Sequence, residues 1–260
     1  MLLLLTNDDG IYAPGLHALA KALEDRHRLV VVAPEHEASA VGHGITVNTP
    51  LRVREARRNG IFFGYSVNGT PADCVKIAVQ QLMDSGPDMI ISGINAGANV
   101  GVNVLYSGTV SAAIEGAFLG LRSIAVSLND RVKPDFTAAA SLIPGIVDFL
   151  ERIPWRGGMA FNINIPALPP SEIRGIALVR QATVRFKDCY ERRTDPRGHD
   201  YYWLAGEEDF DGDGERGTDV SALRNRMIAV TPIQYDLTCV RSLENLDPDD
   251  IPSVEDLTSG

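Results

Sequence analysis

Short apolar runs alternate with helical patterns of hydrophobic residues along the first two thirds of the chain. Continuous apolar runs predict buried strands. These runs are MLLLLT (1–6), RLVVVAP (28–34), PDMIISGIN (87–95), RSIAVSL (122–128) and MAFNINIP (159–166). Between the first two runs, apolar residues recur at helical spacing: Leu16, Leu19, Ala20 and Leu23. Strands separated by helices predict an α/β fold with a mostly parallel sheet that helices cover on both faces.

Two other patterns complete this part of the chain. The segments on either side of Gly60, ITVNTPLRVREA and IFFGYSV, are typical of β structure. The sequence T-P-A-D begins a helix well, because Thr70 is a typical N-cap, Pro71 fits the first helical position, and Asp73 lies near the positive end of the helix dipole. A further helical pattern, VSAAIEGAFLG, starts at Val110.

The character of the chain changes at about Arg174. Short strands, turns and acidic loops follow, with a short helix predicted at DVSALRN (219–225). We therefore expect a catalytic core over residues 1–173 and a smaller, β-rich C-terminal extension over residues 174–260.

Composition narrows the class of protein. The chain has 260 residues, of which 45% are hydrophobic and 22% charged, so a packed core is expected. Its net charge of -10 argues against binding to a nucleic-acid backbone, which needs clustered Lys and Arg. A small anionic substrate stays compatible with this charge if a metal ion reverses the sign locally.

The cysteines and the apolar runs bear on where the protein works. Cys74, Cys189 and Cys239 are widely spaced and odd in number, which argues against a disulfide framework and against a structural zinc site. The first apolar run is too short for a signal peptide and lacks a basic flank, and no run is long enough to span a bilayer. We expect a cytoplasmic protein without a membrane segment.

Candidate chemistry follows the ends of three predicted strands, where ligands bind in open parallel sheets. Asp8 and Asp9 come directly after the first strand. Adjacent carboxylates raise each other's pKa unless a positive charge lies between them, and their oxygens suit Mg²⁺ or Mn²⁺. The alternative is that one aspartate caps the turn and the other is solvated.

The third predicted strand leads into a loop rich in glycine and asparagine. Gly93, Gly97 and Gly101 recur every four residues and alternate with Asn95, Asn99 and Asn103. Glycines let the backbone approach a ligand, although a purely structural loop fits the pattern equally well. The loop matches neither the P-loop nor the dinucleotide-binding glycine pattern.

Ser107, Gly108 and Thr109 follow that loop and precede a helical pattern. Free N–H groups and two hydroxyls at a helix start can cradle a phosphate. Ordinary helix capping explains the same residues and is the commoner use of a serine there.

An acidic stretch near the C-terminus matches the first half of a calcium-binding EF-hand loop: Asp209, Asp211, Asp213 and Gly214. The closing position, which requires a glutamate, is Val220. We therefore predict a solvated turn that does not bind calcium.

Several of these stretches together resemble the SurE family of survival proteins, metal-dependent phosphatases that act as nucleotidases. The motifs that carry the resemblance are TNDDGIYAPG (6–15), VVAPEHEASAVGHGIT (31–46), NGTPADCV (68–75), PDMIISGINAGANVGVNVLYSGTVSAAIEG (87–116), RGHDYYWLAG (197–206), GTD (217–219) and VTPI (230–233). They extend over most of the chain. Two positions depart from the family pattern: Asn103 stands where many members have an acidic residue, and Arg226 replaces a common glycine.

The resemblance implies a Rossmann-like core and the hydrolysis of nucleoside monophosphates, with 3′-nucleotidase and exopolyphosphatase activity as further options. It implies one divalent cation per subunit, Mg²⁺ or Mn²⁺, held by Asp8, Asp9, Ser39 and Asn95. It places Asn99, Ser107, Gly108 and Thr109 near the phosphate. It also implies a homo-oligomer, a dimer or a tetramer, that forms through swapped C-terminal segments.

The mechanism that we expect is metal-assisted hydrolysis. Asp8 or Asp9 accepts a proton from water, and Ser107 and Thr109 stabilise charge on the phosphoryl oxygens. A covalent aspartyl-phosphate is the less favoured route, because no D-x-D pair accompanies these carboxylates. Two other functions remain as alternatives: a dinucleotide-dependent oxidoreductase, whose glycine pattern is missing after the first strand, and a non-catalytic nucleotide-binding module.

Overall fold

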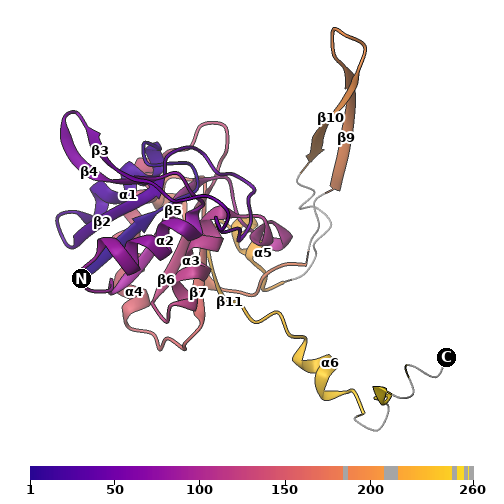
Figure 1. Ribbon diagram of the computed structural model, residues 1–260. Helices are drawn as coiled ribbons and strands as arrows, with labels where there is room; N and C mark the ends of the chain where they lie inside the picture. The colour runs from indigo at the N-terminus through magenta and orange to yellow at the C-terminus, as the bar shows by residue number, and fades with distance from the viewer. Residues whose placement is uncertain (184–186, 208–215, 248–250, 255–256, 258–260) are drawn as a thin grey trace.

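A computed structural model describes residues 1–183, 187–207, 216–247, 251–254 and 257 (Figure 1). The acidic stretch Asp209–Gly214 lies outside the described residues. Two sheets are present in the described part of the chain: a large one with nine strands and a separate two-stranded hairpin.

The large sheet is mostly parallel, as the alternation of strands and helices predicted. Its strands, in spatial order, are β3 (Val53–Arg58), β4 (Ile61–Val67), β2 (Arg28–Pro34), β1 (Leu2–Thr6), β5 (Met89–Ala96), β6 (Ser123–Asn129), β7 (Met159–Pro166), β11 (Ile228–Gln234) and β8 (Ile176–Leu178). Only the β3–β4 and β7–β11 pairs are antiparallel. The chain runs from β1 to β2 on one side and returns to β5 on the other, so a crevice opens beyond the end of β1.

The helices and tight turns of the described chain are α1 (Pro14–Leu23), α2 (Pro71–Ile77) with a π-type turn at Ala78–Leu82, a 3₁₀ turn at Gly101–Leu105, α3 (Gly108–Phe118), α4 (Phe136–Glu151), a 3₁₀ turn at Pro170–Glu172, α5 (Asp219–Arg224) and α6 (Val240–Glu244). The predicted capping of α2 is confirmed. The Thr70 hydroxyl accepts a hydrogen bond from the Asp73 backbone N–H, and the Asp73 carboxylate accepts one from the Thr70 backbone N–H.

The side chains of β1 show how the sheet divides the core. Leu3 and Leu5 pack with α1 and α4, whereas Leu4 faces the opposite side and packs with α2 and α3. All three leucines are fully buried. Alternate residues of a strand point to opposite faces, so the leucine run anchors both helical layers and holds the end of β1 in place.

Segments after residue 173 take two forms. Strands β8 and β11 extend the large sheet, and β11 pairs with β7. The hairpin of β9 (Lys187–Thr194) and β10 (Asp200–Glu207) stands away from the body (Figure 1). The division of the chain at residue 173 stays a prediction.

Arg226, one of the two departures from the family pattern, lies in the turn before β11. Its backbone adopts φ of +61°, a left-handed conformation in which glycine is favoured. The side chain forms a long ion pair with Glu172, with 3.6 Å between the charged atoms. Arginine therefore stands at a position whose backbone suits the glycine common in the family.

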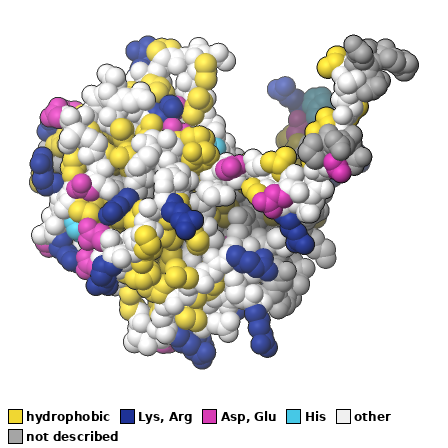
Figure 2. All heavy atoms as spheres, turned by 90° about the horizontal axis from the view of Figure 1, so that it is seen from below, with side chains coloured by type: hydrophobic (Ala, Val, Ile, Leu, Met, Phe, Trp, Pro, Cys, Tyr) yellow, Lys and Arg dark blue, Asp and Glu magenta, His cyan; other side chains and the backbone are white. Residues whose placement is uncertain are grey.

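Lys and Arg side chains are scattered on the face drawn in Figure 2, among acidic and hydrophobic ones. This face offers no concentrated positive charge of the kind that attracts a nucleic-acid backbone. No helix in the described part of the chain is both long and apolar enough to cross a membrane.

Candidate active site

The ends of β1, β2 and β5 meet where the sequence predicted a site. The Asp8 carbonyl accepts a hydrogen bond from the Ala38 N–H at 2.8 Å, which joins the loop after β2 to the end of β1. The first turn of α3 reaches the same point, because the Thr109 hydroxyl donates to the Asp8 carboxylate. Residues far apart in the sequence therefore surround one aspartate.

Asp8 is buried against the start of α3. A Cβ added at Gly108 would lie 2.7 Å from the Asp8 Cβ, so only glycine leaves room for the carboxylate at this distance. Burial raises the pKa of Asp8, and hydrogen bonds from the Thr109 hydroxyl and backbone N–H oppose this rise. The predicted helix N-terminus thus contacts a carboxylate of the protein itself.

Asp9 is more exposed than Asp8 and lies among negative charges. Burial, followed by the charges of Asp8 and Glu37, raises the pKa of Asp9 to about 7. Within the described residues, no basic side chain forms an ion pair with Asp8 or Asp9. The structure therefore keeps the uncompensated carboxylate pair that the sequence suggested.

Ser39 lies in the loop after β2, one residue beyond Ala38. Its hydroxyl is exposed and donates to the Glu37 carboxylate at 2.7 Å. The sequence pattern did not indicate Glu37, although its charge raises the pKa of both Asp8 and Asp9. Nothing in a single glutamate of the run EHEAS distinguishes it from a solvated loop residue, so only the fold reveals its position.

Asn95 lies at the end of β5. Its Nδ2 donates to the Gly97 carbonyl at 2.8 Å. This bond fixes the amide, and among the described residues no donor reaches its Oδ1. The side chain therefore keeps an oxygen available for a ligand.

Asn99 is directed into the protein. Its Nδ2 donates to the Ser127 hydroxyl at 2.9 Å, and its backbone N–H donates to the Asn164 side chain at 2.8 Å. Its carbonyl accepts from Asn162 and Asn164. These contacts stiffen the glycine–asparagine loop, and they use most of the hydrogen-bonding groups that Asn99 could offer to a phosphate.

Asn162 and Asn164 were hidden within a predicted buried strand. Both are fully buried on one face of β7, at the alternate positions that share a side of the sheet. Two polar residues at alternate positions of an otherwise apolar strand indicate that a polar group packs against that face of the sheet.

Ser107 is the N-cap of α3, and its Oγ accepts a hydrogen bond from the Val110 N–H at 3.1 Å. A hydroxyl that accepts this bond still has its own proton to donate. Capping and phosphate binding are therefore compatible at Ser107.

Asp219, from the late motif GTD, also serves the glycine–asparagine loop. It is fully buried, and it accepts hydrogen bonds from the backbone N–H groups of Gly101 at 3.0 Å and Ala182 at 2.9 Å. The C-terminal part of the chain thus holds in place the loop that leads to Ser107.

The residues present fit a hard divalent cation. Two carboxylates, an exposed hydroxyl and an amide oxygen provide the oxygen ligands that Mg²⁺ and Mn²⁺ prefer. Buried like charges without a basic partner are what a bound cation stabilises. Among the described residues, no group of three or more His, Cys, Asp or Glu side chains could hold a metal ion, and the candidate set contains two such side chains, Asp8 and Asp9.

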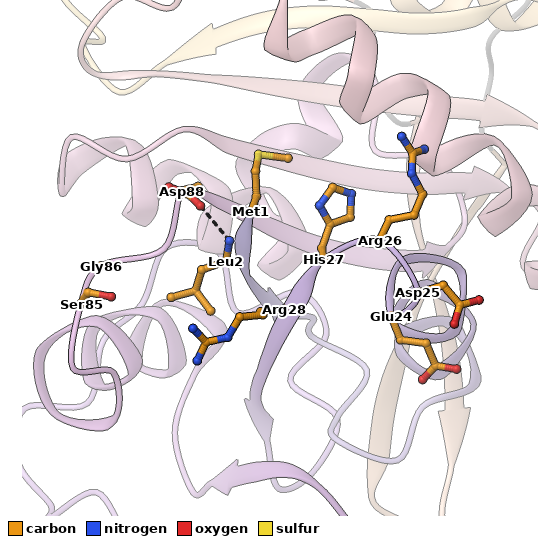
Figure 3. A pocket seen from close by; sticks show the side chains of 10 residues that line it. All are labelled: Met1, Leu2, Glu24, Asp25, Arg26, His27, Arg28, Ser85, Gly86 and Asp88. Carbon is orange, nitrogen blue, oxygen red and sulfur yellow. Dashed lines mark hydrogen bonds between the residues drawn. The ribbon is translucent and has the colours of Figure 1, made fainter.

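A pocket of about 540 Å³ lies at the opposite ends of the strands (Figure 3). It is lined by Arg26, His27, Arg28 and Asp88, among others. Leu2 also lines it at the start of β1, whereas Asp8 lies beyond the other end of that strand, and the four steps from Leu2 to Thr6 alone span about 13 Å. This pocket is therefore separate from the carboxylate pair.

Known proteins resemble this chain over almost its whole length. The family model described as "Survival protein SurE" matches residues 3–188. The chain is similar to the 5′-nucleotidase SurE of Syntrophobacter fumaroxidans, with 49% identity over 246 residues that cover 95% of this chain and 98% of that protein. It is also similar to the 5′-nucleotidase SurE of Natranaerobius thermophilus, with 48% identity over 261 residues, 96% of this chain and 100% of that protein.

Among solved structures, the chain is similar to the SurE protein from Aquifex aeolicus, with a TM-score of 0.82 and 40% identity. The alignment covers 95% of this chain and 98% of that one.

Proposed function

Because this chain belongs to the SurE family, we propose that it is a 5′-nucleotidase, a hydrolase that depends on a divalent metal ion and releases phosphate from nucleoside monophosphates. The observation that carries the proposal is the uncompensated pair Asp8 and Asp9 at the switch point of the sheet, against the N-terminus of α3. A dinucleotide-dependent oxidoreductase has no glycine pattern at this place to support it.

Asp8, Asp9, Ser39 and Asn95 would hold one Mg²⁺ or Mn²⁺ per subunit. The Asn95 amide is already oriented by Gly97, and the Ala38–Asp8 hydrogen bond brings the Ser39 loop to the carboxylates. When bound, the cation supplies Lewis-acid polarisation of a phosphoryl oxygen and lowers the pKa of water.

Asp9 is the carboxylate that we assign as proton acceptor. The carboxylate of Asp8 accepts the Thr109 hydroxyl, whereas no hydrogen bond to the Asp9 side chain is found among the described residues. A base needs a free oxygen within reach of the water that it deprotonates. Thr109 then positions Asp8 and does not contact the phosphate.

Ser107 and Gly108 would bind the phosphoryl group at the start of α3. The Ser107 hydroxyl can donate its proton while it accepts the capping bond, and the N–H groups of the first turn, which begins at Gly108, add donors beside Asp8. Donors fixed in this way stabilise the charge that develops on the phosphoryl oxygens. Asn99 supports the loop next to them through its inward hydrogen bonds.

The exposed apolar residues of the C-terminal part support a homo-oligomer, a dimer or a tetramer. On the hairpin these are Tyr190, Tyr201, Tyr202, Trp203 and Leu204. Side chains of this kind are usually covered by a partner. The exposed apolar side chains of α6, Val240 and Leu243, are consistent with the swapped C-terminal segments that the family resemblance implies.

A phosphate-release screen tests the proposed function. Nucleoside 5′-monophosphates and 3′-monophosphates and polyphosphate are incubated with Mg²⁺, Mn²⁺ or EDTA. We expect release from 5′-monophosphates that requires metal and stops with EDTA. The 3′-monophosphate and polyphosphate arms define the breadth of activity. Metal-independent release, or none from any monophosphate, would contradict the proposal, and nucleotide binding without release would favour the non-catalytic module.

A further inference from the structure

The loop after β2 has no helix or strand between Glu35 and Arg52, yet it carries Ser39. A loop of this length depends on contacts with the rest of the protein to hold a side chain in one position. The Ala38–Asp8 hydrogen bond holds the loop just before Ser39, and the contacts after Ser39 hold its other side.

The strongest of these contacts is a buried carboxylate on α3. Glu115 has a side chain that is 7% exposed, and its two oxygens have different partners. Oε2 is 2.8 Å from Nε2 of His43 in the loop, and Oε1 is 3.1 Å from Nζ of Lys76 on α2. Burial raises the pKa of Glu115, but the bonds to His43 and Lys76 outweigh burial and leave that pKa below its usual range.

The His43 ring is fixed on a second side by Phe118, one turn further along α3. The two rings meet edge to face, with centroids 5.8 Å apart. An aromatic contact and a hydrogen bond to a buried carboxylate together leave the ring little freedom. His43 therefore joins the loop to α3 through a single side chain.

Backbone contacts on either side of His43 complete the attachment. The Gly42 N–H donates to the Tyr106 carbonyl at 3.1 Å, and the Thr46 N–H donates to the Asp73 carboxylate at 3.1 Å. Tyr106 directly precedes Ser107. The loop is thus attached both to α2 and to the segment that begins α3.

We infer that His43 and Glu115 are positioning residues for the metal site: through α3 they hold the Ser39 loop in register with Asp8. The inference rests on the proposed function. Helix α3 contacts Asp8 through its first turn and His43 near its end, so the length of this helix sets the distance between the two contacts. Neither residue contacts the substrate or the metal ion.

Three variants test the inference in the full-length protein. His43→Ala removes the hydrogen bond to Glu115, and His43→Gln keeps an N–H donor of similar reach. His36→Ala is the matched control, because His36 lies in the same loop and its side chain has no hydrogen bond within the described residues. His43→Asn, which ends short of Glu115, replaces the alanine variant if that variant does not fold.

Two measurements are made on each variant. Hydrogen exchange of residues 36–46 in the metal-free protein reports the attachment of the loop, and we expect about tenfold faster exchange in His43→Ala. Calorimetric titration with Mn²⁺ reports the metal site, and we expect about tenfold weaker affinity. His43→Gln restores both values, and His36→Ala changes neither.

The outcomes separate this inference from the proposed function. Wild-type protein that binds neither Mn²⁺ nor Mg²⁺ in the same titration would overturn both. Wild-type binding with an unchanged Mn²⁺ affinity in His43→Ala would overturn the inference alone, whether or not the loop exchanges faster. An equal loss of affinity in His36→Ala would also overturn it, because the effect would then belong to the loop in general.

Discussion

Replacing Gly108 by alanine would press a methyl group against the Asp8 carboxylate. The added Cβ would lie 2.7 Å from the Asp8 Cβ and 3.0 Å from its Oδ2. Favourable contacts between carbon atoms are about 3.5 to 4.0 Å, so Asp8 or the start of α3 has to move by roughly 1 Å. The Thr109 hydroxyl holds the same carboxylate, so this movement also strains or breaks that hydrogen bond.

The size of the effect follows from this overlap. Overpacking of a buried position costs about 1–3 kcal/mol of unfolding free energy. For a chain of this length, Tm falls by about 2–4 °C per kcal/mol, so we expect a decrease of about 2–12 °C. A displacement of about 1 Å at a reacting group lowers the rate by about 10²-fold, which is the loss of kcat/KM that we expect on a nucleoside monophosphate.

Gly145 in α4 provides the control. A Cβ at Gly145 would meet no atom within 4 Å, so Gly145→Ala should stabilise the protein by about 0.5–1 kcal/mol and leave kcat/KM unchanged. Thermal unfolding and phosphate release are measured for both variants. A Gly108→Ala protein with wild-type Tm and kcat/KM would refute the packing of Asp8 against α3 and its place in the site.

Three further variants probe the site and its surroundings. Asp9→Asn should abolish metal-dependent phosphate release and weaken Mn²⁺ binding in calorimetry, while apo stability stays unchanged or rises because like-charge repulsion is relieved; wild-type Mn²⁺ affinity would remove Asp9 from the site. Ser107→Ala should lower kcat by about 10²-fold and, because the capping bond is lost, lower stability by about 1 kcal/mol; near-wild-type kcat in the destabilised variant would leave Ser107 as a cap only. Arg226→Gly should raise the free energy of unfolding by about 0.5–1 kcal/mol in thermal or denaturant unfolding, because it relieves the left-handed backbone and loses only an exposed ion pair; a less stable variant would show that the arginine side chain outweighs that strain.

Much of the fold is encoded in local patterns. The runs 28–34 and 159–166 form β2 and β7 with the predicted bounds, and Thr70 caps α2 as its sequence indicates. Each of these features depends on residues that are close together in the chain. The strands follow from continuous apolar runs, and the cap of α2 follows from a hydroxyl three positions before the N–H that it binds. The mostly parallel sheet follows from the order of strands and helices.

The environment of the candidate site was not encoded in this way. The sequence indicates only that Asp73 lies near the positive end of a helix dipole, but its carboxylate also accepts the N–H of Thr46. Glu115 looks like a single charge on a helix, although it joins two other elements. No residue close to Asp73 or Glu115 in the sequence predicts these partners. Pairs of this kind depend on how the sheet brings distant segments together, so the residues that hold a site are harder to predict than those that form it.

The crossover of the chain at β1 also sets the order in which the protein can become functional. Asp8 and Thr109 are 101 positions apart in the sequence, and Leu3 pairs with Leu29 on one side and Met89 on the other. Closing such distant segments costs chain entropy before any contact compensates for it, whereas α1 and α2 form from neighbouring residues. We therefore expect the carboxylate pair to reach its neighbours during refolding only after the central strands have paired. A nascent chain cannot assemble this site until α3 has been synthesised.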